Sequence, residues 1–314
     1  MNVPEKPSHQ EYRSGHELVG ILPEKEAKKI EAYMEAVEKG EFTPVEPRFA
    51  STVMIVRNTP EPPYKPRFHS KAAAEDRIAP PNGIEVFMMR RQNSMAFLPD
   101  AVVFPGGRVD PADADPALPW EGPTPAQWAE RIGKDEVTTR QIIVAAVREV
   151  FEESGILLAG TPDGKILTDV TGDEWLAERK ALADHQQSFA SMLIRRNLVL
   201  RSDLLCFHSN FITPEYSPKR YDTFFFSALC PEGQDADDKS RETYIADWVE
   251  PQWALDMVDA GTLTMVPVTI YHLGMIARSN NLQDLVTADK TAKPFMFRPY
   301  RTEDGTIVNK GILP

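Results

Sequence analysis

Three glutamates on one face of a predicted helix constrain this chain more than any other feature. Glu149, Glu152 and Glu153 lie within Arg148–Ile156, which has the sequence REVFEESGI. Their i, i+3, i+4 spacing places the three carboxylates on one face of an α-helix. Charges of the same sign repel at this distance, and partial burial raises carboxylate pKa values. The cluster therefore favours a positively charged partner.

Apolar residues bury the other side of this helix, which is predicted over 138–154 with Gly155 as its C-terminal stop. They recur at three- and four-residue spacing as Ile142, Ile143, Ala146, Val147, Val150 and Phe151. An acidic triplet on an exposed helix usually marks only a solvated face, but these flanks place the carboxylates at the edge of a cleft. Convergent oxygen ligands suit Mg²⁺ or Mn²⁺. We expect Arg148 to pair with Glu152 or to support the nearby glycine-rich segment.

The remaining pattern predicts an α+β fold. Strands are expected at 50–57, 84–91, 101–104, 204–212, 221–229 and 247–249. Further helices are expected between Pro23 and Gly40 and over 126–132, 173–197, 251–260 and a final one over 266–277. Residues 1–23 and the tail from 293 are expected to be irregular, and Pro105-Gly106-Gly107 to form a tight turn close to a ligand. The elements lack a regular βαβ rhythm, which favours a mixed sheet in a layered fold.

Charge and composition exclude some partners. The chain has 35 basic and 47 acidic residues, a net charge of −12, which argues against nucleic acid or an anionic membrane as a partner. A candidate basic patch for a small anion lies within 57–91, although a solvated surface stretch is the favoured interpretation of its residues, which are Arg57, Lys65, Arg67, Lys71, Arg77, Arg90 and Arg91. Cys206 and Cys230 are far apart, so neither a disulfide nor a zinc site is expected. Without a leader or an apolar run, the sequence predicts a soluble cytoplasmic protein.

The second half of the glutamate segment resembles the Nudix box, which ends in Arg-Glu-apolar-x-Glu-Glu-x-Gly-apolar. Arg148–Ile156 matches each defined position, and Phe104-Pro105-Gly106-Gly107 is similar to the glycine start of the box. The resemblance implies a Nudix-type α/β/α sandwich with a mixed sheet. It implies that Glu149, Glu152 and Glu153 bind metal, that Arg148 braces the loop, and that Gly106 and Gly107 shape the substrate site.

The box is interrupted in this chain. Gly107 and Arg148 are 41 positions apart (148 minus 107), about 27 more than the pattern has. The first glutamate of the box has two candidate counterparts, Asp110 and Asp113. In this respect the chain resembles the coenzyme A diphosphatase branch called nucleoside-diphosphate-linked moiety X motif 19, which has a long insert at the same place. The segments FLPDAVVFPGGRVD (97–110) and ITPEYSPKRYDTFFF (212–226) are also similar to that branch. Another coenzyme A-cleaving branch has an arginine-and-glycine signature here, of which Arg91 fits while Ala96 and Asp100 do not.

Several other residues have both a structural and a functional interpretation. Arg220 either pairs with Asp222 at a strand edge or binds a substrate phosphate with its forked guanidinium. Phe224, Phe225 and Phe226 are expected in the core rather than as a base-stacking platform. Glu215 and Glu250 are expected to be surface acids, although each is also a candidate base or metal ligand. His208 is expected to be a hydrogen-bonded interior residue.

These features together predict a Nudix hydrolase that cleaves a diphosphate linkage in a small nucleoside-diphosphate-linked substrate. Glu149 or Glu152 is the candidate proton acceptor, Mg²⁺ or Mn²⁺ the cofactor, and Arg91 and Arg220 the candidate substrate contacts. The resemblance favours coenzyme A or acyl-coenzyme A, which would give 4′-phosphopantetheine and adenosine 3′,5′-bisphosphate. NADH or ADP-ribose hydrolysis is the alternative within this class, and a non-catalytic Nudix-like binding module is the alternative outside it.

The expected organisation is an N-terminal segment with an accessory helix, followed by one catalytic domain. The segment covers 1–48 and the Nudix domain 49–314, with the box at 106–156 and the insertion at about 111–137. The accessory helix has a narrow apolar stripe, so it is expected to pack on the main domain or on the second subunit of a homodimer.

Overall fold

A mixed eight-stranded sheet forms the centre of the computed structural model, which describes residues 7–314 except 22–23, 61–81, 93–99, 240–242 and 289. The strand order is β11-β3-β2-β10-β9-β12, and the short strands β4 and β5 pair with β3 and β2. β10 runs parallel to β2, whereas β2 and β3 are antiparallel, which confirms a mixed sheet. The strands are β2 (Arg48–Asn58), β3 (Ile84–Arg91), β4 (Val102–Val103), β5 (Gly106–Arg108), β9 (Leu205–Ile212), β10 (Tyr221–Leu229), β11 (Thr243–Val249) and β12 (Pro294–Phe295).

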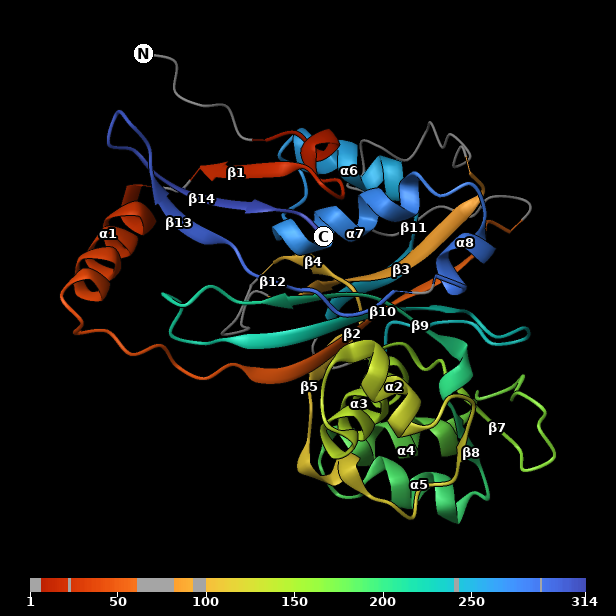
Figure 1. Cartoon of the computed structure of the whole chain (residues 1–314). Coiled ribbons are helices and arrows are strands. Elements are labelled where there is room, and N and C mark those ends of the chain that lie inside the picture. The colour runs from red at the N-terminus through yellow and green to blue at the C-terminus, as the bar shows by residue number, and fades with distance from the viewer. Residues whose placement is uncertain (1–6, 22–23, 61–81, 93–99, 240–242, 289) are drawn as a thin grey trace.

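Helices cover both faces of this sheet (Figure 1). One face packs against α2 (Pro125–Ile132), α3 (Glu136–Ser154), α4 (Asp173–Ala183) and α5 (Phe189–Arg195). The other packs against α6 (Pro251–Asp259), α7 (Pro267–Ala277) and α8 (Leu282–Val286). Strand alternation divides the core between the faces, because Phe224 and Phe226 join the first cluster and Phe225 the second. The predicted α/β/α sandwich and the core position of these phenylalanines are confirmed.

Both ends of the chain contribute to a second, smaller sheet, so the prediction that they are irregular was wrong. Its order is β1 (Glu17–Ile21), β14 (Ile307–Ile312) and β13 (Arg298–Arg301). Leu18, Ile307 and Val308 are buried in these strands, but Val19, Tyr300 and Ile312 are exposed, so the three short strands lack a clear apolar pattern. The accessory helix α1 (Glu24–Glu38) is confirmed and packs beside β14. The division of the chain at residue 48 stays a prediction.

The single helix predicted over 173–197 was wrong, because this segment forms two helices, α4 and α5. Both contribute residues to the cleft described below. Between α4 and α5 the chain turns through His185, whose φ of 54° lies in the left-handed region. Ser188 then starts α5 by accepting a hydrogen bond from the Ser191 amide. The apolar spacing of 173–197 continues across this break, which is why periodicity alone missed it. α8 is a second correction, because it follows the helix predicted to be the final one.

The predicted insertion contains its own short elements. They are the 3₁₀ turn η2 (Pro111–Ala114), β6 (Trp120–Glu121) and α2, whose Trp128 is fully buried. β6 pairs with β8 (Val199–Arg201), which also pairs with β7 (Ala159–Gly160), so the three form a small sheet. Two further 3₁₀ turns in the described residues are η1 (His9–Glu11) and η3 (Ser202–Leu204). Both cysteines are free. Within the described ranges, no helix combines the length and the apolar composition needed to cross a membrane.

Candidate active site

Helix α3 holds the glutamate cluster in a fixed orientation. Asp135 caps its first turn by accepting a hydrogen bond from the Thr138 amide at 2.9 Å, and Gly155 ends it with a φ of 82°. The predicted apolar face is buried against the sheet. Glu149 and Glu152 therefore face away from the core, with side chains 13% and 14% exposed, and Glu153 is more deeply buried.

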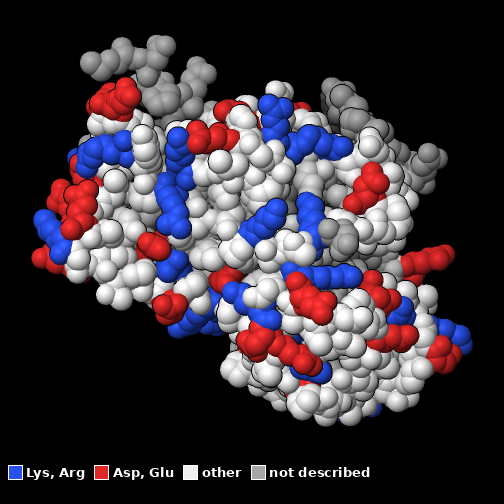
Figure 2. All heavy atoms as spheres, in the orientation of Figure 1, with Lys and Arg blue, Asp and Glu red and all other residues white. Residues whose placement is uncertain are grey.

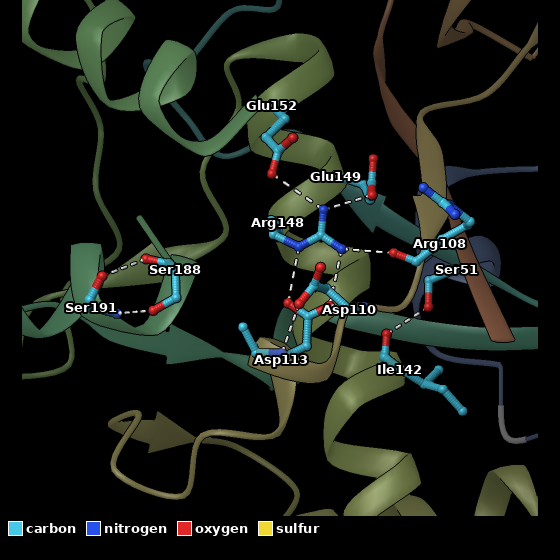
Figure 3. A network of polar contacts seen from close by, with 11 residues as sticks. Ser51, Arg108, Asp110, Asp113, Ile142, Arg148, Glu149, Glu152, Ser188 and Ser191 are labelled. Atoms are coloured by element: carbon cyan, nitrogen blue, oxygen red, sulfur yellow. Dashed lines mark hydrogen bonds and ion pairs between the residues drawn. The ribbon is translucent and has the colours of Figure 1, made fainter. Parts of the chain in front are cut away.

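Arg148 is at the centre of the polar network (Figure 3). Its Nη1 donates to Glu149 Oε1 at 2.7 Å and to Glu152 Oε1 at 3.3 Å. Its Nε and Nη2 each donate to Asp113 at 3.0 Å, and Nη2 also donates to the Arg108 carbonyl at 2.9 Å. The arginine thus pairs with Glu152 and also braces the segment after the two glycines, so both predicted contacts are formed.

Asp113, rather than Asp110, forms the buried carboxylate pair with Arg148. Asp113 is 3% exposed, and both of its oxygens accept from the guanidinium. Asp110 caps η2 by accepting from the Ala112 amide, and its own amide donates to Asp113. Asp113 also stands six positions after Gly107, the position that the first glutamate of the box occupies.

The ionisation of these groups reflects burial and mutual charge. Burial raises the pKa of Glu149 to about 7, with the Glu152 charge adding to the rise and Arg148 opposing it. Burial also raises the pKa of Asp113, outweighing the Arg148 charge. Burial acts to lower the pKa of Arg148, but the charges of Glu149 and Asp113 outweigh it, so the net shift is upward. Arg148 therefore stays positively charged.

Gly106 and Gly107 form strand β5 rather than the predicted tight turn, but the predicted close approach of the backbone is real. β5 pairs with β2, so its conformation is extended. A Cβ on Gly106 would lie 2.5 Å from the Ser51 carbonyl oxygen, and one on Gly107 would lie 2.5 Å from the carboxyl carbon of Glu149. The Gly106 amide also donates to Glu153 Oε2 at 2.7 Å. Gly107 thus leaves the room that the Glu149 carboxylate occupies, and Gly106 lets β5 lie close to β2.

We expect Gly107→Ala to lower turnover by about 100-fold, because the added methyl displaces the Glu149 carboxylate. The displaced group is the end of a flexible side chain, so the free energy of unfolding should change by less than about 1 kcal/mol. Gly20→Ala in strand β1 is the matched control, since its Cβ would make only ordinary contacts, the nearest at 3.7 Å. Equal turnover in Gly107→Ala and Gly20→Ala would contradict this role for Gly107.

The carboxylates lie in a cleft of about 1660 Å³ that passes between the sheet and helices α3, α4 and α5. Arg91 lines it, as the prediction of a substrate contact requires. Five other cations also line it, none of which was predicted: Arg48, Arg108, Arg179, Lys180 and Lys239. In Figure 2, basic side chains follow the boundary between the sheet and the helical lobe on the face shown. The sequence signal that could have identified Arg108 was its position directly after Gly106-Gly107.

Arg220 does not reach the cleft. Its guanidinium donates to the carbonyls of Thr213 and Val45 at 3.0 and 2.8 Å, and it contacts the Met296 sulfur. These contacts bury the side chain and brace the chain before β2, which corrects both the phosphate contact and the ion pair with Asp222. Asp222 binds Lys134 instead, at 2.9 Å.

The candidate basic patch within 57–91 is not one surface. Arg57 binds Glu85 and Asp235, and Arg90 binds Asp100. Arg91 alone of the described members lines the cleft. Lys65, Arg67, Lys71 and Arg77 lie outside the described residues, as does Ala96 of the incomplete signature.

The minor candidates have structural roles. Glu250 is buried and caps α6 by accepting from the Gln252 amide, so it is not the surface acid expected. Glu215 accepts from the Tyr33 hydroxyl at 3.0 Å. His208 binds Ser227 and the Leu285 carbonyl, as predicted, and burial lowers its pKa to about 4.

The glutamate cluster fits a divalent cation by its chemistry. No three acidic, histidine or cysteine side chains in the described part of the chain are already arranged as a metal site. Glu149 and Glu152 nevertheless contact a positive group, the Arg148 guanidinium, from neighbouring positions. Their oxygen donors suit Mg²⁺ or Mn²⁺, and such a charge opposes the rise in pKa that burial imposes on Glu149.

The fold is similar to that of a solved Nudix hydrolase. The crystal structure of a Nudix hydrolase from Alicyclobacillus acidocaldarius matches with a TM-score of 0.61 and 24% identity, covering 79% of this chain and 99% of that one. A family model for the NUDT19 Nudix domain matches residues 124–276, which include α3 and β10.

Curated relatives agree with this assignment. Putative nudix hydrolase 7 of Caenorhabditis elegans is 27% identical over 217 residues, covering 69% of this chain and 64% of that protein. Acyl-coenzyme A diphosphatase NUDT19 of Xenopus laevis is 25% identical over 237 residues, covering 64% of this chain and 62% of that protein. The matches thus span a little under two thirds of these relatives' own length. Together these matches support a Nudix hydrolase of the NUDT19 branch.

Proposed function

We propose that this protein is a divalent-metal-dependent diphosphatase that acts on coenzyme A or acyl-coenzyme A. The single observation that carries the proposal is the carboxylate cluster of Glu149, Glu152 and Glu153, which lines a cleft together with several cations. The relatives named acyl-coenzyme A diphosphatase support the choice of substrate. The products are 4′-phosphopantetheine, acylated or not, and adenosine 3′,5′-bisphosphate.

The three glutamates would hold Mg²⁺ or Mn²⁺, which supplies charge neutralisation of the diphosphate and makes water more acidic. Glu149 or Glu152 is the proton acceptor, since both carboxylates line the cleft. Arg148 and Asp113 keep Glu149 and Glu152 in position through the hydrogen bonds described above. Arg108 and Arg48 enter the cleft from neighbouring strands and would bind the diphosphate oxygens.

A panel of diphosphates tests the proposal. Purified protein would be incubated with Mg²⁺ or Mn²⁺ and coenzyme A, octanoyl-coenzyme A, NADH or ADP-ribose, and the products identified by chromatography. Turnover of the two coenzyme A compounds supports the proposal. Turnover of NADH or ADP-ribose alone would overturn the substrate assignment. No turnover of any compound would favour the non-catalytic binding module.

Arg108→Ala is expected to lower kcat/KM by about 10- to 100-fold, the range for losing one charge-assisted hydrogen bond. Arg108 is exposed in the cleft, so its removal should leave the melting temperature unchanged. Arg301→Ala is the control, because Arg301 is away from the cleft and forms an exposed ion pair with Glu31 and a hydrogen bond to the Gly305 carbonyl. A kcat/KM for Arg108→Ala within twofold of the wild-type value would remove Arg108 from the site.

A further inference from the structure

The break between α4 and α5 adds two cationic residues to the cleft. Lys180, on the last turn of α4, and His185, in the turn that follows, both line it and are exposed. His185 has a φ of 54°, a left-handed conformation that is uncommon outside glycine and that concentrates at functional positions. If α4 continued through this segment, Lys180 and His185 would lie on successive turns of one helix.

The acidic residues near Lys180 have other partners. Glu178 binds Arg195 and Arg196 at 2.5 and 2.8 Å, and Asp237 binds Arg179 at 2.7 Å. Asp184 also has a partner of its own. Among the described residues, no carboxylate lies within ion-pair distance of Lys180, so its charge is available to a ligand. Lys239, whose amine is 3.8 Å from Asp237, adds a further positive charge to the cleft lining.

Lys180 follows a residue that contacts the glutamate helix α3. The preceding residue, Arg179, donates to the Glu152 carbonyl at 3.2 Å, so α4 crosses the C-terminal end of α3. Lys180 lines the same cleft as the glutamate cluster. The part of the cleft beside α7 differs in character, because apolar side chains line it, including Phe211, Val266 and Phe297. The cationic part of the cleft suits the nucleotide half of an asymmetric diphosphate, and the apolar part beside α7 suits an apolar second half.

We propose that Lys180 and His185 form a second anion subsite, which binds a phosphate monoester on the nucleotide half of the substrate. This subsite is separate from the diphosphate contacts of Arg108 and Arg48. The substrate class is then a nucleoside diphosphate derivative with an additional phosphate group, and its apolar half extends toward α7. The inference rests on the proposed function for its orientation, and it makes a binding prediction that does not require turnover.

Binding of two nucleotides tests the subsite directly. Isothermal titration would compare adenosine 3′,5′-bisphosphate with adenosine 5′-monophosphate, which lacks the second phosphate. We expect the wild-type protein to bind the bisphosphate about 10- to 100-fold more tightly, as one or two charge-assisted hydrogen bonds provide. Lys180→Ala should bring that ratio close to one, His185→Gln should reduce it, and Lys180→Arg should largely retain it. Lys165→Ala, an exposed lysine outside the cleft, should leave it unchanged.

Hydrolysis of coenzyme A and dephospho-coenzyme A provides the second test. The ratio of their kcat/KM values should favour coenzyme A in the wild-type protein and shrink by at least about tenfold in Lys180→Ala. Equal binding of the two nucleotides by the wild-type protein, or a ratio unchanged in Lys180→Ala, would overturn the subsite. Absence of all turnover would count against the proposed function alone, since the titration still decides the subsite.

Discussion

Glu152→Gln is expected to lower kcat by at least about 100-fold, the lower limit for losing a group that handles charge or protons in the reaction. The substitution keeps the shape of the side chain but removes the negative charge on the exposed side of α3. A steady-state assay with coenzyme A and Mg²⁺ measures the change. Titration with Mn²⁺ gives an independent measurement, in which the affinity for the metal should also fall.

Glu174→Gln is the matched control for this variant. Glu174 lies on α4, is 71% exposed and binds Arg196 at 3.4 Å, so its charge is outside the network of Arg148. Its kcat and its Mn²⁺ affinity should equal those of the wild-type protein. If Glu152→Gln retained wild-type kcat and metal affinity, the metal role of Glu152 would not stand.

Asp113→Ala is expected to have the largest effect on stability, lowering the free energy of unfolding by about 3 kcal/mol. Both partners of the Asp113–Arg148 pair are buried, with side chains 2% and 11% exposed. Removing Asp113 leaves two nitrogens of Arg148 without their carboxylate, although Glu149 and Glu152 still offset part of its charge. Urea unfolding followed by circular dichroism measures the loss.

Asp110→Ala separates this buried pair from the general effect of altering η2. Asp110 caps the turn through one hydrogen bond, at 2.8 Å to the Ala112 amide, so its removal should cost about 1 kcal/mol. A loss in Asp113→Ala no larger than that in Asp110→Ala would show that the ion pair contributes little. Activity should fall in Asp113→Ala as well, because Arg148 then no longer has a fixed position between the glutamates.

The sequence predicted the elements whose side chains repeat with a clear period. Helix α3 and strands β3 and β10 lie within about two residues of their predicted bounds, because each has an apolar pattern and a defined stop. The pairing of β1 with β14 joins residues nearly 300 positions apart, for example Glu17 and Ile312, and no local pattern encodes such a contact. The break at His185 was missed because apolar spacing continues through it.

The candidate site was predictable to the extent that a local motif defines it. Glu149, Glu152, Glu153 and Arg148 share one helix, so their spacing already placed them together. The choice between Asp110 and Asp113 depended on which carboxylate folds back onto Arg148, which only the three-dimensional arrangement decides. Arg220 looked suited to phosphate because of its chemistry, but its burial at the β2 entrance gives it backbone partners.

The contact between Asp113 and Arg148 bears on how far the length of the segment between them can vary. The segment 115–135 joins η2, which carries Asp113, to α3, which carries Arg148, so the ion pair closes a loop that contains this segment and the first turns of α3. Closing a flexible loop of twice the length costs only about 0.6 kcal/mol more, so evolution can lengthen or shorten this excursion at little thermodynamic expense. Searches that demand a constant spacing between glycine and arginine will therefore overlook homologues with the same chemistry, whereas a search for the two halves of the motif separately will find them.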